Sequence, residues 1–163
     1  KEILKESGKE YCLLHCVSIY PTPINEAHLD RMSYLKKFSN DVGMSEHSNP
    51  DKDGLKISIS SLMYKPKYIE RHFTILDPSK TKDGIVSLNP KDLKKLVEIS
   101  KFNDEELKSY IKENIPEFEE LKGNPNRSLS NLELLNRDYY RGRFASLSED
   151  GNYIYNWEET AIN

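Results

Sequence analysis

Two short stretches of the sequence carry a histidine near their ends, and their layout could place both imidazoles at one metal ion. Residues 42–48 and 68–74 each begin mostly apolar, follow turn-forming residues, and carry His47 and His72 respectively. If both stretches are strands that run parallel, about 4.8 Å apart, the two histidines share a face at matching ends. Two imidazoles with no cysteine nearby suit a borderline divalent ion such as Mn²⁺, Co²⁺ or Zn²⁺ better than Ca²⁺.

A parallel sheet is the element that must bring these histidines together. A third run, residues 11–18, is almost continuously apolar, as in a parallel strand that is buried on both faces. The order strand, helix, strand, helix, strand, helix is typical of an α/β sheet with right-handed crossovers. We therefore expect residues 11–18, 40–46 and 67–73 to form three adjacent parallel strands in that order, with helices on the outer face.

Capping residues and helical spacing predict the remaining elements. These are the last turns of a helix in residues 1–9, a helix carrying Leu29, Met32, Leu35 and Phe38, a short helix over 55–64, a helix opening at Asn89-Pro90, a helix over 104–114, and a hairpin around 150–152. Residues 75–89 read as a polar loop between the third strand and its helix.

Composition bounds the class of protein. A chain of 163 residues is long enough for one domain with a real core. The net charge of −3 gives no electrostatic argument for binding nucleic acid. No apolar run approaches the length of a transmembrane helix, and Cys12 and Cys16 fit a reducing compartment. We expect a cytoplasmic protein with neither a membrane nor a nucleic acid as partner.

Four motifs resemble those of the N-acetylneuraminate (sialic acid) synthase family. They appear in the family's order at residues 14–23 (LHCVSIYPTP), 43–48 (GMSEHS), 69–74 (IERHFT) and 87–90 (SLNP). The first three are similar to the family's sixth-, seventh- and eighth-strand signatures, and the fourth to the motif before its eighth helix. Any one of these motifs would be weak evidence, but four in order over about residues 12–100 make a strong signal.

The resemblance implies an α/β fold that is part of a TIM-type (β/α) barrel. Residues 1–123 would be the last three βα units, strands six to eight with their helices, and residues 124–163 a C-terminal extension. The implied activity is condensation of phosphoenolpyruvate with an N-acetylated hexose, such as N-acetylmannosamine, to a nonulosonic acid. The first five barrel units would lie outside this chain, which is then a fragment of an enzyme and inactive alone. Its partners would be the missing part of the barrel or a second copy of itself.

The resemblance also implies roles for matching residues. His47 and His72 match metal ligands, with Mn²⁺ as the expected cofactor. Ser18 and Ser45 match residues that contact phosphoenolpyruvate. Tyr20 matches a residue that lines the sugar site, and a final candidate, Asp83, matches a carboxylate that binds sugar hydroxyls.

The chain departs from the family's pattern at three places. Glu46 stands where the family usually has Asp, and the loop between His72 and Asp83 lacks the family's Pro-Gly-Pro. Residues 53–66 are polar and serine-rich where the family usually has an Ala/Gly-rich helix.

Plainer interpretations compete for several of these residues. Asp83 could be an ordinary loop carboxylate, and Glu70 could orient a metal ligand or pair with a lysine. His15 is expected to be a satisfied buried histidine, and His28 to be solvated on a helix surface. Cys12 and Cys16 are expected in the core, facing the barrel interior.

Two functions from different classes therefore remain at this point. One is the synthase-type enzyme; the other is a non-catalytic module that keeps the barrel scaffold as a binding surface. Three βα units would also leave two open sheet edges, so we expect either self-association or coverage of an edge by the tail, whose arginines, Arg137, Arg141 and Arg143, lie among aromatic residues.

Overall fold

The computed structural model describes residues 6, 8–140, 145–147 and 153–155. The chain divides into two units, Lys1–Arg127 and Ser128–Asn163, and each is described by itself. The first unit carries every candidate site residue. Most of the helix end expected in residues 1–9, and the predicted hairpin turn at 150–152, lie outside the described residues.

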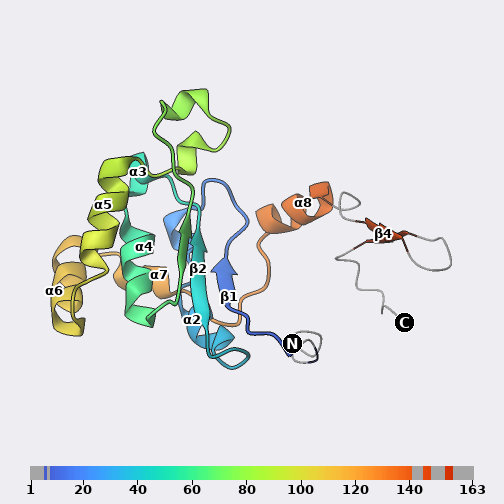
Figure 1. Cartoon of the computed structure of the whole chain (residues 1–163), viewed down its shortest axis with the longest axis horizontal. Helices are drawn as coiled ribbons and strands as arrows, with labels where there is room; N and C mark the ends of the chain where they lie inside the picture. The colour runs from blue at the N-terminus through green and yellow to red at the C-terminus, as the bar shows by residue number, and fades with distance from the viewer. Residues whose placement is uncertain (1–5, 7, 141–144, 148–152, 156–163) are drawn as a thin grey trace. The chain divides into compact units, whose positions relative to one another are not determined.

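A three-stranded parallel sheet forms the centre of the first unit (Figure 1). Its strands β1 (Leu13–Cys16), β2 (Val42–Glu46) and β3 (Ile69–Arg71) lie side by side in the order β1-β2-β3. Both pairings are parallel, so the predicted sheet is confirmed, with strands shorter than expected. The chain is therefore an α/β protein with a small parallel sheet.

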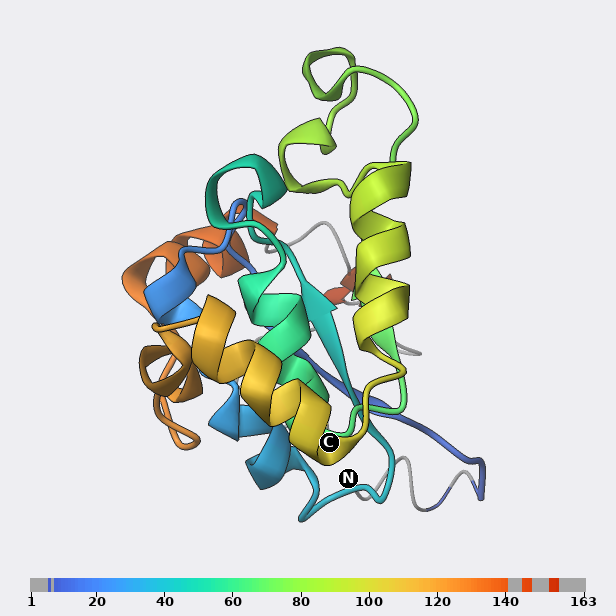
Figure 2. The same ribbon diagram turned by 90° about the vertical axis from the view of Figure 1, so that its left-hand side faces the viewer.

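Helices pack on one face of this sheet, as the alternating pattern predicts (Figure 2). They follow the strands along the chain as α2 (Asp30–Leu35), α3 (Pro50–Asp53), α4 (Lys56–Ser61), α5 (Pro90–Ile99), α6 (Asp104–Asn114) and α7 (Phe118–Lys122). The core fills the space between strands and helices with buried aliphatic side chains, among them Leu29, Met32, Met44, Ile57 and Leu88. Burial of this apolar surface holds the helices against the sheet.

Asparagine caps explain where several helices begin. The Asn89 side chain accepts a hydrogen bond from the Asp92 N–H at the start of α5. Asn103 and Glu106 form a reciprocal capping box at the start of α6. The predicted bounds of α6 are confirmed, and the short helix predicted over 55–64 is observed as α4 followed by the 3-10 helix η2 (Leu62–Tyr64).

The helix predicted to carry Leu29 to Phe38 is shorter than expected. A 3-10 helix, η1 (Ile24–Glu26), comes first, and α2 begins only at Asp30. His28 separates the two with a positive φ of 45°. The prediction that its ring is solvated on a helix surface is wrong. Nδ1 accepts a hydrogen bond from the Asn124 N–H at 3.1 Å, and Nε2 lies 3.3 Å from a Glu26 carboxylate oxygen.

The segment expected to be a loop after β3 contains two short 3-10 helices. They are η3 (Pro78–Lys80) and η4 (Gly84–Val86), and they stand at the carboxyl end of the sheet (Figure 1). Gly84 is required there, because a Cβ at this position would lie 1.9 Å from the Pro78 carbonyl oxygen.

The second unit contains the helix α8 (Asn131–Tyr140) and two strands. The strands β4 (Ala145–Leu147) and β5 (Tyr153–Tyr155) pair antiparallel, which confirms the two strands of the predicted hairpin. Among the described residues, no helix has the length and hydropathy to cross a bilayer.

The two cysteines do not lie in the core, which corrects the prediction. Cys16 is exposed and Cys12 is only half-buried. Cys16 lies on the face of β1 that is turned away from the helices of the first unit, where Leu14 is also 37% exposed. The predicted strand was expected to be covered on both faces, but in the first unit this face of β1 is open.

His15 is the buried histidine that the sequence predicts. It is 3% exposed on the helix side of β1, and its Nε2 donates to the Ala27 carbonyl oxygen at 2.8 Å. Burial lowers the pKa of His15 to about 4.

We expect a histidine-dependent loss of stability in mild acid. The fold keeps His15 neutral, so its contribution is fully present above its unfolded pKa of about 6.5 and is lost as the pH falls toward 4. That loss amounts to about 3 kcal/mol, from roughly 1.4 kcal/mol per pKa unit. Urea unfolding between pH 7 and pH 4 measures it, and His15→Gln should flatten the profile by this amount. An unchanged pH profile in His15→Gln, matching that of the control His28→Gln, would show that His15 is not responsible.

Candidate metal and substrate site

The candidate residues lie together at the carboxyl ends of the three strands. Beyond β1 the backbone stays extended enough for exposure to alternate, with Val17 and Ile19 buried and residues 16, 18 and 20 exposed. Ser18 and Tyr20 therefore share the open face with Cys16. The Thr22 N–H donates to the His47 carbonyl oxygen at 2.9 Å, and this bond fixes the segment after β1 against the end of β2.

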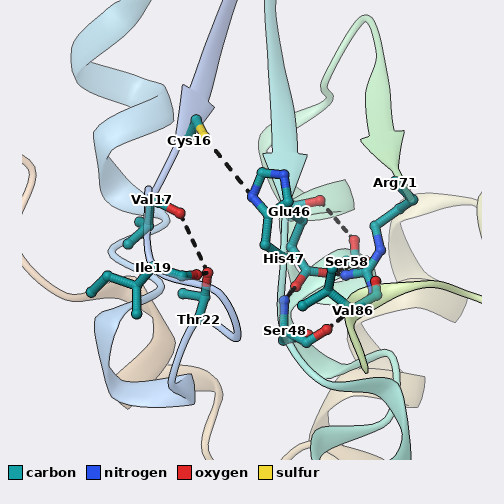
Figure 3. A network of polar contacts seen from close by, with 11 residues as sticks. Cys16, Val17, Ile19, Thr22, Glu46, His47, Ser48, Ser58, Arg71 and Val86 are labelled. Carbon is teal, nitrogen blue, oxygen red and sulfur yellow. Dashed lines mark hydrogen bonds and ion pairs between the residues drawn. The ribbon is translucent and has the colours of Figure 1, made fainter. Parts of the chain in front are cut away.

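Among the candidate residues at the strand ends, His47 is held by burial and by contacts at both ring nitrogens. It is 4% exposed, and its Nε2 lies 2.9 Å from the Tyr20 hydroxyl. The two rings also stack, with centroids 4.1 Å apart. On the other side, the Cys16 thiol lies 4.0 Å from His47 Nδ1 (Figure 3). The expectation that no cysteine lies near the histidines is therefore wrong. Each ring nitrogen of His47 has a polar neighbour, Tyr20 at Nε2 and Cys16 at Nδ1.

His72 lies beside His47, as the parity argument predicts. Their ring centroids are 5.3 Å apart, and the planes meet at 62°. The backbone of His72 is fixed by the Leu88 N–H, which donates to its carbonyl oxygen at 2.8 Å. The Asp83 carboxylate lies 3.9 Å from His72 Nδ1, so this predicted loop residue does reach the site.

Ser45 and Glu70 form a hydrogen-bonded pair near the same carboxyl ends of the strands. They are partners in the register of β2 and β3, and the Ser45 hydroxyl donates to Glu70 Oε1 at 2.6 Å. Of the two alternatives for Glu70, the structure shows neither a lysine partner nor a histidine bond among the described residues. It shows a carboxylate that orients the Ser45 hydroxyl.

Burial and the charged groups around His47 determine its protonation state. Its pKa is lowered, first by burial and then by His72, while the nearby carboxylates of Glu70 and Asp83 act in the opposite direction. The neutral form is therefore favoured at neutral pH. A neutral imidazole keeps the lone pair that metal ligation needs.

The donor set fits a weakly held divalent ion. A divalent ion bound here would take one nitrogen from each of the two imidazoles, whose centroids lie 5.3 Å apart. Within the described part of the chain, no group of three or more His, Cys, Asp and Glu side chains is arranged to hold a metal. Two protein ligands would leave most coordination positions to water and substrate oxygens. Ligation through Nε2 of His47 would require the Tyr20 hydroxyl to move aside.

A buried charge pair directly behind the histidines was not predicted. Glu46 and Arg71 form an ion pair on the helix side of the sheet, with side chains 1% and 4% exposed (Figure 3). Burial lowers the pKa of Arg71 to about 10, so it stays charged at neutral pH. Ser58 of α4 donates to Glu46 Oε2 at 2.5 Å. Two departures from the family's pattern, Glu46 and the serine-rich helix, are thus in direct contact.

The sequence did contain a signal for this pair. Glu46 and Arg71 each precede a candidate metal ligand by one residue and carry opposite charges. By the alternation of side chains, the residue before each histidine must face the helices if the histidine faces the open side. A charged residue on the buried side of a strand needs a partner, and each supplies the other.

Comparison with known proteins agrees with the four motifs. Residues 1–112 match the model of the NeuB family, so the chain belongs to the NeuB family. It is similar to the N-acetylneuraminate-9-phosphate synthase of Drosophila melanogaster, with 39% identity over 98 residues, which cover 58% of this chain and 25% of the fly protein. It is also similar to the N,N'-diacetyllegionaminic acid synthase of Campylobacter jejuni, with 40% identity over 85 residues, 52% of this chain and 24% of that protein.

Solved structures show the same fold. The spore coat polysaccharide biosynthesis protein SpsE of Bacillus subtilis superposes with a TM-score of 0.69 over 94% of this chain and 45% of that one, at 23% identity. The sialic acid synthetase of Leptospira borgpetersenii superposes with a TM-score of 0.56 over 85% of this chain and 42% of that one, at 27% identity. The chain thus spans about a quarter of the curated relatives named above and less than half of these solved chains. The two curated relatives named above are both sugar-acid synthases.

Removing the second imidazole should raise the pKa of His47. In His72→Gln the repulsion from a protonated His72 is lost, while burial still keeps the pKa of His47 below 6.5. Titration of the imidazole resonances by NMR measures the change. The control His28→Gln should leave the pKa of His47 in place. A pKa of His47 that falls or does not move in His72→Gln would contradict this account of the site's electrostatics.

Proposed function

We propose that this chain is the metal-bearing C-terminal part of a (β/α)-barrel synthase that joins phosphoenolpyruvate to an N-acylated hexose. The product would be a nonulosonic acid. The observation that carries the proposal is the meeting of His47 and His72 at the carboxyl ends of β2 and β3, the end of a parallel barrel where active sites lie. Relatives of the chain are synthases of N-acetylneuraminate 9-phosphate, N,N'-diacetyllegionaminic acid and pseudaminic acid, which supports the same reaction class.

The proposed fold of the whole protein is a closed barrel, of which β1, β2 and β3 would be strands six to eight. A barrel abolishes the open edges that three strands leave. It would also cover the face of β1 on which Leu14 and Cys16 are exposed. The remaining strands would supply the lysine and acidic groups that bind phosphate and sugar.

Each candidate residue has a role in this proposal. His47 and His72 would hold a divalent ion, Mn²⁺ by preference, which when bound supplies a Lewis acid and a template for the reacting oxygens. Ser18 and Ser45 would contact phosphoenolpyruvate, and the Glu70 carboxylate would fix the direction of the Ser45 hydroxyl. The last two roles go to Tyr20 and Asp83, which would line the sugar site.

The resemblance to the synthase family implies the chemistry. The enol carbon of phosphoenolpyruvate forms a bond to the aldehyde carbon of the sugar, and the aldehyde oxygen takes up a proton. Water then adds at the carbon that bears the phosphate, and phosphate leaves with cleavage of its C–O bond. Asp83 and Tyr20 would orient the aldehyde for attack, because a small error in geometry costs a large share of the rate. Cys12 and Cys16 fit a reducing compartment, so the location we propose is the cytoplasm.

The 163-residue chain alone should not catalyse the condensation. Its site would lack the phosphate-binding groups of the remaining strands, so positioned attack could not occur. Release of phosphate from phosphoenolpyruvate in the presence of N-acetylmannosamine and Mn²⁺ measures this. Turnover by the purified chain would contradict the proposal that further barrel units complete the site.

A chimera tests the proposed site directly. Residues 11–112 would replace the matching segment of the C. jejuni N,N'-diacetyllegionaminic acid synthase, to which this chain is 40% identical over 85 residues. We expect metal-dependent turnover of phosphoenolpyruvate that His47→Ala and His72→Ala each abolish, while His28→Ala leaves it intact.

The outcomes separate the two classes of function. A folded chimera whose histidine variants keep full activity and full metal response would show that the site assignment is wrong. A folded chimera with no turnover would favour the non-catalytic module.

A further inference from the structure

The buried pair behind the histidines connects the segments that carry His47, His72 and Asp83. Glu46 and Arg71 are partners in the register of β2 and β3. Because side chains alternate, they face the helices, while the next residues, His47 and His72, face the open side. The ion pair therefore lies directly across the sheet from the two imidazoles.

The guanidinium of Arg71 reaches beyond its partner. Nη2 donates long hydrogen bonds to the carbonyl oxygens of Ser48, at 3.4 Å, and Val86, at 3.3 Å. Nη1 lies 3.4 Å from the Ser58 hydroxyl. One side chain thus contacts the segment after β2, the 3-10 helix η4 and the helix α4.

Each of the two carbonyl contacts lies next to a site residue in the sequence. Ser48 follows His47, and its N–H donates to Glu46 Oε1 at 2.5 Å. Val86 ends η4, the turn that begins directly after Asp83. Arg71 itself precedes His72, so the three segments that carry the histidines and the carboxylate all meet at one guanidinium.

We propose that Arg71 is the positioning residue of this site: its guanidinium sets the spacing of His47, His72 and Asp83, and Glu46 holds it in place. The proposal deepens the proposed function, because the spacing matters for binding a metal between the imidazoles. It assigns Arg71 no contact with substrate or metal.

The chemistry of the side chain explains why an arginine is needed. A guanidinium presents five donors in a rigid planar fork, so it can bond a carboxylate and two carbonyl oxygens at once. A lysine ammonium is a point charge on a flexible stem and would keep the attraction to Glu46 without spanning to both Ser48 and Val86. Buried ion pairs contribute little net stability, so stability alone does not account for this one.

Arg71→Lys separates positioning from charge balance. We expect a melting temperature close to that of the unchanged chain, since Glu46 keeps a cationic partner. We expect Co²⁺, used alone as the probe and followed by titration calorimetry, to bind about 10-fold more weakly, as for other residues that orient metal ligands. We also expect His47, which is 4% exposed, to lose its protection against carbethoxylation by diethyl pyrocarbonate, mapped by mass spectrometry.

Two further variants keep the test decisive. Glu46→Gln with Arg71→Met removes the pair without leaving a buried charge, so the fold should survive while Co²⁺ affinity and His47 protection fall as in Arg71→Lys. The matched control, Lys56→Met with Glu117→Gln, removes a half-buried ion pair between α4 and the N-cap of α7. It should change neither readout.

The readouts also distinguish this proposal from the proposed function. If the unchanged chain binds no Co²⁺, the proposed metal site is wrong, and protection of His47 alone decides the role of Arg71. Wild-type protection of His47 in both Arg71 variants would overturn the positioning role, whatever their metal affinity.

Discussion

The parallel register of β2 and β3 is the constraint on which the rest of the site depends. It places Met44 beside Ile69, Ser45 beside Glu70, and Glu46 beside Arg71. Because successive side chains point to opposite faces, this one register gives the core an apolar pair and the open face a hydrogen-bonded pair. A slip of β3 by one residue would turn His72 toward the helices and move Arg71 to the open face, away from Glu46.

The charge pair strengthens this constraint. A single charge buried to this degree would cost several kcal/mol, so Glu46 and Arg71 tolerate burial only when they face one another with their hydrogen bonds made. Any register that separates them is therefore disfavoured. One nitrogen, Nε of Arg71, remains without a partner among the described residues. The pair thus specifies which strands pair and how, more than it adds to net stability.

The open face of the sheet is more exposed than the helix side. Its side chains are half-exposed or exposed apart from Ser45 and His47, and its polar groups bond to one another across strands, as Ser45 bonds to Glu70. His47 is buried under Tyr20 and kept neutral by desolvation and by its neighbour His72. A neutral, held imidazole next to a more exposed one is an arrangement that can accept an ion without first losing a proton. The same burial that disfavours charge on His47 therefore favours the neutral form that the proposed metal site would need.

The sequence by itself determined the order and direction of the strands, the face each histidine occupies, and the family. These follow from local periodicity: the alternation within residues 42–48 and 68–74 and the strand-helix order need no knowledge of distant contacts. Only the tertiary structure decided which side chains meet across the sheet. The charge pair joins residues 25 positions apart, and Ser58 reaches Glu46 from a separate helix. Cys16 next to His47, and His28 bonded to Asn124, likewise depend on packing between segments far apart in the chain. Local pattern fixes the direction in which a side chain points, whereas its partner is set by the long-range fit of helices against strands, which no short window of sequence contains.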